Sequence, residues 1–385
     1  MASGSAHPNE DRMMAMEIET SRGSEGSGSL SSGVAHGLHD SAAGQVRVAA
    51  FLGGRAVGSA RFRVHQYIPY LERQGIHIKE FVARFGSWPP QNRALRSLWF
   101  PATFLDRIPS VFKSHNYDVA LLQREMISTL VTLERFTRRP RLLDVDDAVW
   151  LNMSSEGTFA TLARMCDGVI CGNSFIEESV RRWQSETTVL PTAVDTGRFC
   201  PLPAPERRSL RQIVGWSGTG SGLKYLSRIE PALAAVLSNH RDALLRVVCD
   251  QSPHFRALDP SSVEYIRWSP ENEVRTIQEM TIGLMPTEDT LWARGKCSYK
   301  MLLYMSCGVP VVVSPVGMNN EVLSLGSIGF GARNHAEWAD CMSWLLDNPE
   351  KGREIGSTGR RIVERYYSLH TLAPRLGKYI RRFIH

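Results

Sequence analysis

Two lysines four residues apart, Lys296 and Lys300, have the spacing that most directly suggests chemistry. They lie in "WARGKCSYKMLLYMSCGVPVVVSP", which predicts a helix over residues 297–307 that ends at Gly308, before a strand at 311–313. The positive end of a helix dipole disfavours cations in the first turn unless an anion is bound there. The pair, with Arg294 beside it, therefore indicates a phosphate site, and solvated surface lysines are the alternative.

Glycine-rich turns follow three of the predicted strands. They are Gly53-Gly54, "GWSGTGSG" at 215–222 and "SPVGMNNE" at 314–321. In open α/β sheets, ligands bind beyond the carboxyl ends of strands, often where such a turn enters a helix. None of the three fits the dinucleotide fingerprint GxGxxG, and no P-loop motif is present. A strand–helix connection without ligand is the alternative for any single turn.

A third group of polar side chains, "DVDD" at 144–147, ends another apolar run. It resembles a DxD motif that holds a divalent metal ion against a diphosphate. Because the lysine pair lies in the other half of the chain, we expect no metal site here. A hydrogen-bonding role on the acceptor side is favoured, with Asp146 and Asp147 as the best candidate catalytic carboxylates. A structural helix cap is the alternative.

The bulk composition is that of a globular protein with an anionic partner. The chain has 385 residues, a net charge of +6 and a pI of about 9.0. This basic balance suits a phosphorylated ligand or a membrane surface, and no nucleic-acid-binding motif accompanies it. The seven cysteines form no CxxC pair, so reduced thiols and no structural zinc are expected. Without an apolar signal-peptide core or spanning run, we expect a cytoplasmic protein, either free or peripheral at the inner face of a membrane.

The order of predicted elements divides the chain into four segments. Residues 1–44 are rich in Ser, Gly and Ala and are expected to be a disordered tail. Strands alternate with helices over 45–200. A proline-rich linker follows, and the alternation then restarts within 201–370. Such alternation predicts α/β architecture with two Rossmann-like parallel-sheet domains facing a cleft. Residues 371–385 are expected to form a helix that returns to the N-terminal domain.

Residues 88–113 combine large aromatic side chains with cations. Trp88, Trp99 and Phe100 lie among Arg93 and Arg96 in a segment that contains "WPP". Aromatic and basic side chains together favour the headgroup layer of a membrane. We therefore expect peripheral membrane contact here, and aromatic packing under an irregular segment is the alternative.

Several of these motifs together resemble the family 4-like glycosyltransferases of the GT-B fold (glycosyl transferases group 1). "KCSYKMLLYMSCGVPVVVSPVGMNNEVL" resembles their donor-binding signature, and "GSARFRVHQYIPYLERQGI", "LLDVDDAVW" and "IVGWSGTGSGLKYL" occur in the expected order. "TIGLMPTEDTLWARGKCSYK" is similar to a branch with a W-x-R-G-K segment. The resemblance covers roughly residues 46–370.

The resemblance implies a nucleotide-sugar donor held by the C-terminal domain and a glycan, lipid-linked or small-molecule acceptor held by the N-terminal one. It implies hexosyl transfer with retention, no metal and no cofactor, as in polysaccharide biosynthesis. Lys224 and either Lys296 or Lys300 would hold the diphosphate, and Glu321 would approach the nucleotide and sugar. The full set of expected donor-binding residues is Gly53, Gly54, Gly218, Lys224, Arg294, Lys296, Lys300, Gly317, Asn319, Asn320 and Glu321.

The chain departs from the family pattern at two positions. Many members carry two glutamates eight residues apart, where this chain has Gly295 and Leu303. The W-x-R-G-K branch also lacks them, so transfer remains the leading hypothesis. Two rivals stay open, a degenerate protein that binds a nucleotide or glycan without transfer and a GT-B epimerase of nucleotide sugars.

Overall fold

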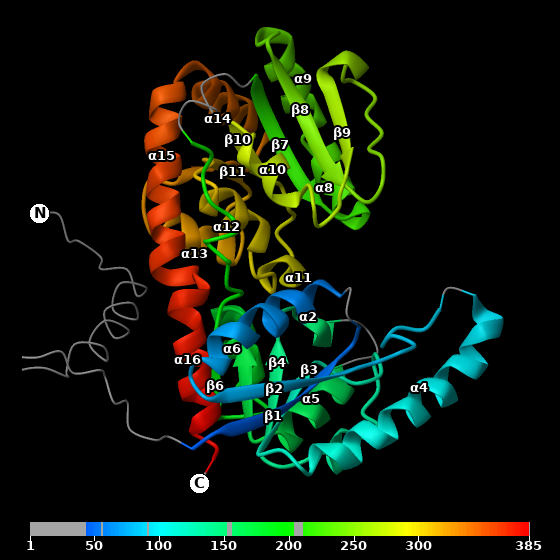
Figure 1. Ribbon diagram of the computed structural model, residues 1–385. Helices are drawn as coiled ribbons and strands as arrows, with labels where there is room; N and C mark the ends of the chain where they lie inside the picture. The colour runs from blue at the N-terminus through cyan, green and yellow to red at the C-terminus, as the bar shows by residue number, and fades with distance from the viewer. Residues whose placement is uncertain (1–43, 55–56, 91, 152–155, 204–210, 385) are drawn as a thin grey trace, which may run out of the picture. The chain divides into compact units, whose positions relative to one another are not determined.

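The computed structural model describes residues 44–54, 57–90, 92–151, 156–203 and 211–384. The predicted tail lies outside these residues except for Gly44, and so do residues 204–209 of the predicted linker over 195–209. Within them the chain forms two six-stranded sheets in which the neighbouring strands run parallel (Figure 1). The prediction of an α/β fold with two Rossmann-like parallel sheets is confirmed. The domain boundaries proposed from the sequence stay predictions.

The first sheet has the strand order β2-β1-β3-β4-β5-β6. Its strands are β1 (Val46–Leu52), β2 (Ile76–Val82), β3 (Val119–Gln123), β4 (Arg141–Val145), β5 (Gly168–Cys171) and β6 (Thr187–Val189). The central strands are buried on both faces, which explains their continuous apolar sequences. Because the strands are parallel, the residues that follow β1, β3 and β4, namely Gly53, Arg124 and Asp146, lie along one edge.

The second sheet has the order β12-β11-β10-β7-β8-β9. Its strands are β7 (Gln212–Gly218), β8 (Ala243–Cys249), β9 (Val263–Arg267), β10 (Ile282–Met285), β11 (Val311–Val313) and β12 (Gly329–Gly331). The sequence did not predict β12, because its "GFG" lacks the β-branched residues that favour strands. The glycine turn at 218–222 follows β7, and Ser314 follows β11, at the carboxyl edge of this sheet.

The connections are mostly helical. The segment between β1 and β6 contains α2 (Gly58–Arg63), η1 (His65–Tyr67), α3 (Ile68–Glu72), α4 (Arg93–Ser114), η2 (Glu134–Phe136), η3 (Val149–Leu151), α5 (Glu156–Met165) and α6 (Ser174–Val180). The segment after β7 contains η4 (Gly220–Gly222), α8 (Leu223–Arg228), α9 (Glu230–Asn239), η5 (Pro260–Ser262), α10 (Glu273–Gln278), α11 (Leu291–Arg294), α12 (Tyr299–Ser306), α13 (Met318–Leu323), α14 (His335–Asp347), α15 (Pro349–Ile362), η6 (Val363–Tyr367) and α16 (Leu369–Arg381).

Two helices differ from their predicted extents. The sequence over 60–74 predicts a single amphipathic helix that ends at Gly75, but the structure has α2, η1 and α3 there, with an irregular backbone at Val64 between the first two. The helix expected over 297–307 begins only at Tyr299, because Ser298 adopts a left-handed conformation with φ of +48°. Lys296 therefore precedes the helix, and the prediction that both lysines project from its first turn is wrong for Lys296.

The C-terminal helix packs on the first sheet although it follows the second in sequence (Figure 1). Leu372 and Ile380 of α16 share an apolar cluster with Val48 of β1 and Leu71 of α3. At the end of α16, Arg381 Nη1 donates to Gly44 O at 3.2 Å. Among the described residues, no helix is both long and apolar enough to cross a membrane.

Candidate functional site

Lys300 lies in the first turn of α12 with its ammonium against the glycine turn after β7. Its Nζ is 4.8 Å from the centroid of the Trp216 ring, a cation–π contact. A Cβ atom at Gly218 would lie only 2.6 Å from this Nζ, and one at Gly222 would lie 3.6 Å from it. Within the described part of the chain, no carboxylate forms an ion pair with Lys300. An anionic ligand at this turn would meet closely approachable backbone and one positive charge that has no acidic partner in the described chain.

The Lys300 ammonium is only partly exposed, and this changes its acidity. Burial and, to a smaller degree, the neighbouring Lys296 lower the pKa of Lys300 to about 8. An anion placed on this nitrogen would reverse the effect, because it favours the charged form. Such a perturbed cation at the carboxyl edge of a sheet is typical of a binding site.

Titration of Lys300 predicts how ligand affinity depends on pH. Only the protonated amine attracts a diphosphate, and the free protein loses that proton as the pH rises through about 8. We expect donor affinity to be constant below this pH and to fall by up to about tenfold per pH unit above it. Calorimetry of nucleotide binding at a series of pH values checks this. A wild-type affinity that stays flat across pH 8 would contradict it.

The glycines of the turn are required by packing as well as by any ligand. A Cβ at Gly218 would also lie 2.6 Å from the Trp216 ring, and one at Gly220 would lie 2.3 Å from Gln251. The Gly220 amide donates to Asp250 Oδ1 at 2.6 Å, which leaves it engaged. Ser217 N donates to the hydroxyl of Tyr304 at 2.7 Å, so α12 and this turn are tied together.

Lys296, unlike Lys300, has a carboxylate partner. Its Nζ lies 2.9 Å from Asp147 Oδ1 and 4.6 Å from the centroid of the Trp292 ring. Asp147 follows β4 of the first sheet, so "DVDD" contacts the lysine segment although the two lie in different halves of the chain. The contact joins Lys296 and Asp147, which are 149 positions apart in the sequence and follow strands of different sheets.

Arg124 joins this contact and was not predicted. Its Nε and Nη2 donate to Asp146 Oδ1 at 2.9 and 2.5 Å, and Nη2 donates to Asp147 Oδ2 at 2.9 Å. Burial alone would lower the pKa of Arg124, but the two carboxylates outweigh it and raise the pKa. Its φ of +64° aims the side chain at them, a conformation that no sequence pattern revealed. Both predicted catalytic carboxylates therefore carry an arginine partner.

Asp144, the first acid of "DVDD", has a structural role. Its side chain is buried and accepts from Arg63 Nε at 3.0 Å and Nη2 at 2.7 Å. Arg63 Nη1 also donates to Leu190 O at 2.7 Å. Among the described residues, no group of three or more His, Cys, Asp or Glu side chains is arranged to hold a metal ion.

The turn after β1 places Gly53 and Gly54 at the edge that carries Arg124. Ser87 N donates to Gly53 O at 3.1 Å, and a Cβ at Gly53 would lie 2.8 Å from Ser87 Oγ. A Cβ at Gly54 would lie 3.1 Å from Val57. Small residues are thus needed here for packing against residues 57 and 87.

The turn after β11 contains four predicted residues. Gly317 has φ of +52°, and a Cβ there would lie 2.7 Å from Arg294 Cα. Asn319 is buried and donates through Nδ2 to Ser314 O at 3.0 Å, while its Oδ1 accepts no hydrogen bond from any residue that the structure describes. Asn320 is exposed, and Glu321 accepts a 2.6 Å hydrogen bond from Ser174 Oγ of α6.

Two predicted cations have other partners. Arg294 is exposed and bonds to both carboxylate oxygens of Asp289, at 2.8 and 3.1 Å. Lys224 is exposed, with its Nζ 4.9 Å from the centroid of the Tyr225 ring. Of the four predicted cations, Lys300 is therefore the one that contacts the glycine turn and lacks an acidic partner within the described chain.

The structure gives a physical reason for the two missing glutamates. A Cβ at Gly295 would lie 2.3 Å from Cβ of Ala148, so no side chain fits there. Leu303 is 5% exposed and belongs to the apolar core. A carboxylate at either position would need a different local backbone or a solvated space that this chain does not provide.

Comparisons with known proteins agree with this geometry. Residues 213–348, which contain β7 to β12, match the family model described as Glycosyl transferases group 1. The fold is similar to sucrose-phosphate synthase from Thermosynechococcus elongatus, with a TM-score of 0.66 and 16% identity over 88% of this chain and 99% of that one. The fold is also similar to that of Anabaena HepE in complex with UDP and glucose, with a TM-score of 0.66 and 15% identity over 88% of this chain and 100% of that one.

A third solved structure extends the likeness. WaaG, a glycosyltransferase involved in lipopolysaccharide biosynthesis, gives a TM-score of 0.60 and 11% identity over 87% of this chain and 99% of that one. At these identities the likeness establishes the fold, which is the two-sheet GT-B architecture. A search among curated proteins finds no significant match.

Proposed function

We propose that this protein is a glycosyltransferase that moves a sugar from a nucleotide-sugar donor to a carbohydrate, lipid-linked or small-molecule acceptor. The observation that carries the proposal is Lys300, an ammonium without an acidic partner in the described chain, held against the glycine turn after β7. The group 1 glycosyltransferase match over 213–348 covers both the turn and the lysine. A nucleoside diphosphate supplies the anion that this arrangement lacks.

The proposed donor site extends from Lys300 to its neighbours. The N-terminus of α12 and the glycine turn approach the same phosphate, although the Gly220 and Gly222 amides of that turn already donate to Asp250 Oδ1 and Thr219 O. Lys296 reaches the second phosphate after leaving Asp147. Gly317 lets the turn after β11 pack against the backbone of Arg294. HepE has been solved with UDP and glucose, and this supports UDP-sugars as the first donors to try.

The chemistry of the proposed transfer is mainly electrostatic. Two lysines and a helix N-terminus stabilise the charge that develops on the leaving diphosphate, which we propose replaces the metal ion that other transferases use. Asp147 is released when Lys296 turns to the phosphate, and it then faces the acceptor with Asp146. Arg124 keeps both carboxylates in place. We propose retention of the anomeric configuration for this transfer.

A ligand screen followed by product analysis tests the proposal. We expect one class among UDP-, GDP-, ADP- and TDP-sugars to raise the melting temperature, and EDTA to leave that rise unchanged. Incubation of that donor with a panel of glycan and lipid-linked acceptors should then release nucleoside diphosphate. Proton NMR of the product should show the donor's anomeric configuration. No melting shift with any nucleotide sugar, or a shift abolished by EDTA, would contradict the proposal.

A second candidate is binding of a nucleotide or glycan without transfer. Gly295 and Leu303 leave no carboxylate at two positions, and Arg124 engages Asp146 and Asp147. Such a protein would show the melting shift, but the donor would stay intact with every acceptor. Intact donor after prolonged incubation would favour this candidate over the transferase.

A further inference from the structure

Helix α4 exposes a row of large apolar side chains to solvent. Leu95, Leu98, Leu105 and Phe112 are 51, 70, 62 and 73% exposed. Their spacing of three or seven residues places them on one face, and we call these four residues the α4 stripe. At a rise of about 1.5 Å per residue, the stripe is roughly 26 Å long.

The opposite face of α4, which packs on the protein, mixes polar and apolar residues. Thr103, Arg107 and Ser114 are buried there beside Val111, and Phe104 and Ile108 are partly buried against the core. Arg107 donates to Leu52 O at 2.7 Å and to Phe81 O at 2.9 Å. The four residues of the α4 stripe lie outside this packed face, so the fold itself does not require them to be apolar.

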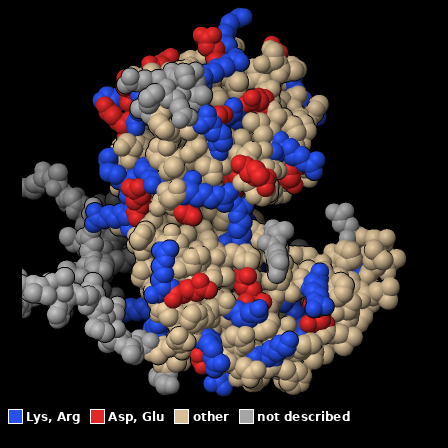
Figure 2. All heavy atoms as spheres, in the orientation of Figure 1, with Lys and Arg blue, Asp and Glu red and all other residues tan. Residues whose placement is uncertain are grey.

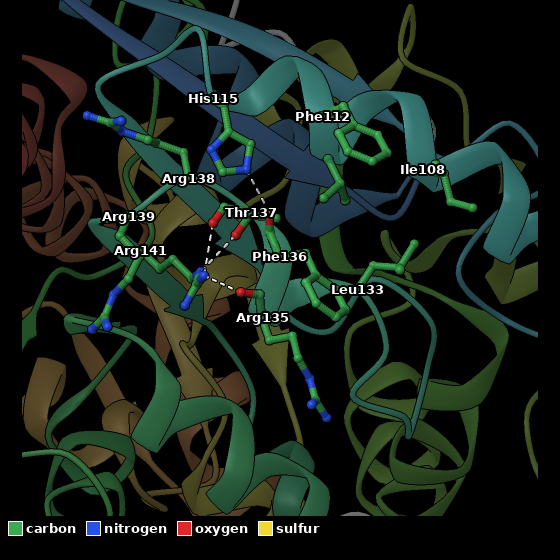
Figure 3. Close-up of a pocket in the computed structure, with 11 residues that line it drawn as sticks. Ile108, Phe112, His115, Leu133, Arg135, Phe136, Thr137, Arg138, Arg139 and Arg141 are labelled. Carbon is green, nitrogen blue, oxygen red and sulfur yellow. Dashed lines mark hydrogen bonds between the residues drawn. The ribbon is translucent and has the colours of Figure 1, made fainter.

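An open pocket of about 750 Å³ continues the stripe at the C-terminal end of α4 (Figure 3). Phe112 and Ile108 of α4 converge there with Leu133 and Phe136, and Phe136 is 56% exposed. The pocket lies at the amino-terminal edge of β4, where Arg141 begins that strand. Asp146 and Asp147 follow the carboxyl end of β4, so the pocket is separate from the candidate donor site.

The charges around this surface are almost all positive. Exposed cations along α4 and beside the pocket are Arg93, Arg96, Lys113, Arg135, Arg138 and Arg139. Asp106, the one acid of α4, is paired with Arg84, and Asp167 pairs with Arg139. Figure 2 shows few acidic side chains over the region of α4. Two copies of this face would bring cations against cations, whereas an anionic surface would neutralise them.

We propose that the α4 stripe and the adjoining pocket form the surface through which this protein binds an anionic lipid bilayer. Apolar side chains enter the acyl boundary while the flanking arginines contact anionic headgroups. The residues differ from those expected from sequence, because Trp99 is partly buried and its Nε1 donates to Phe85 O at 3.0 Å. The pocket adds Arg135, Phe136 and Arg138, which lie outside the predicted 88–113 segment.

Co-sedimentation with vesicles tests this inference. The full chain should bind phosphatidylcholine vesicles that contain phosphatidylglycerol, and it should bind pure phosphatidylcholine vesicles much more weakly. Arg135→Gln/Arg138→Gln should lower the partition coefficient by about thirtyfold, since each cation near an anionic surface contributes about fivefold. Leu98→Ser/Leu105→Ser should abolish the part of the binding that survives high salt.

Arg241→Gln/Arg333→Gln is the matched control, because it removes the same charge from exposed positions elsewhere. It should bind vesicles like the wild type, and all variants should keep the wild-type melting temperature. Equal binding by the α4 and control variants, equal binding to neutral vesicles, or no sedimentation of the wild type would each overturn the inference. So would a wild-type dimer that Leu98→Ser/Leu105→Ser converts to a monomer. Nucleotide-induced melting shifts report on the donor site separately.

Discussion

Lys300→Met is expected to weaken donor binding by roughly 10- to 100-fold while the protein stays folded. The substitution removes the charge, and with it the cation–π contact with Trp216, but keeps an unbranched side chain of similar size. In the described chain no acidic group balances that charge, so its proposed partner is the diphosphate. Calorimetry with the nucleotide sugar chosen by the screen measures the change.

The stability of the same variant separates binding from structure. Burial lowers the pKa of Lys300 to about 8, so the amine is mostly charged at neutral pH but its charged form is less favourable in the folded protein than in the unfolded chain. Lys300→Met should therefore melt at the wild-type temperature or above it. Lys378→Met, at an exposed position of α16, is the control and should bind the donor normally. Wild-type affinity in Lys300→Met would refute the phosphate assignment.

Arg63→Met is expected to lower the free energy of unfolding by about 3–5 kcal/mol, the largest stability effect we predict. Arg63 and Asp144 are both buried, with Nη2 2.7 Å from Oδ2. Without the arginine, the Asp144 carboxylate would remain buried without a cation. Burial already raises the pKa of Asp144 although Arg63 opposes it, and the variant should raise it further.

A double variant distinguishes a lost ion pair from lost packing. Arg63→Met/Asp144→Leu removes both charges, so it should recover much of the stability lost in Arg63→Met. Urea unfolding of the wild type, both single variants and the double variant completes the cycle. If the double variant is as unstable as the sum of the single variants, the buried pair is not the cause.

The central strands were predictable because burial on both faces leaves a continuous apolar run. "VRVAAFL" has the bounds of β1 and "VPVVVSP" contains β11. The edge strand β2, "IHIKEFV", is only partly buried and mixes apolar with polar residues. Gly317 was singled out as a turn residue, and its positive φ explains the choice of glycine. These features depend on neighbours in sequence or on the general composition of buried strands.

The site was less predictable because its contacts join distant residues. Nothing near Asp147 in sequence indicates Lys296, and nothing near Arg124 indicates its left-handed backbone. Gly295 was interpreted as a missing carboxylate, whereas its contact with Ala148 depends on how two turns meet. The roles proposed for all these residues stay predictions until a ligand is bound.

The amphipathic character of α4 shows a similar limit. The sequence indicated a mixture of aromatic and basic residues but not which side faces solvent. Arg107 is buried because Leu52 O and Phe81 O accept from it at the ends of two strands. The buried Arg107 sets which face of α4 packs on the sheet, and it leaves Leu98 and Phe112 on the face exposed to solvent. A side chain whose hydrogen bonds are set by strand ends cannot be assigned from helical periodicity alone.

A crystal structure of the protein with UDP, or with the nucleotide selected by the screen, tests the central claim most directly. We predict a phosphate oxygen within about 2.7–3.0 Å of Lys300 Nζ, beside the backbone of Gly218. We also predict that Lys296 has left Asp147. A nucleotide bound elsewhere, with Lys300 still over Trp216 and Lys296 still paired with Asp147, would contradict the account.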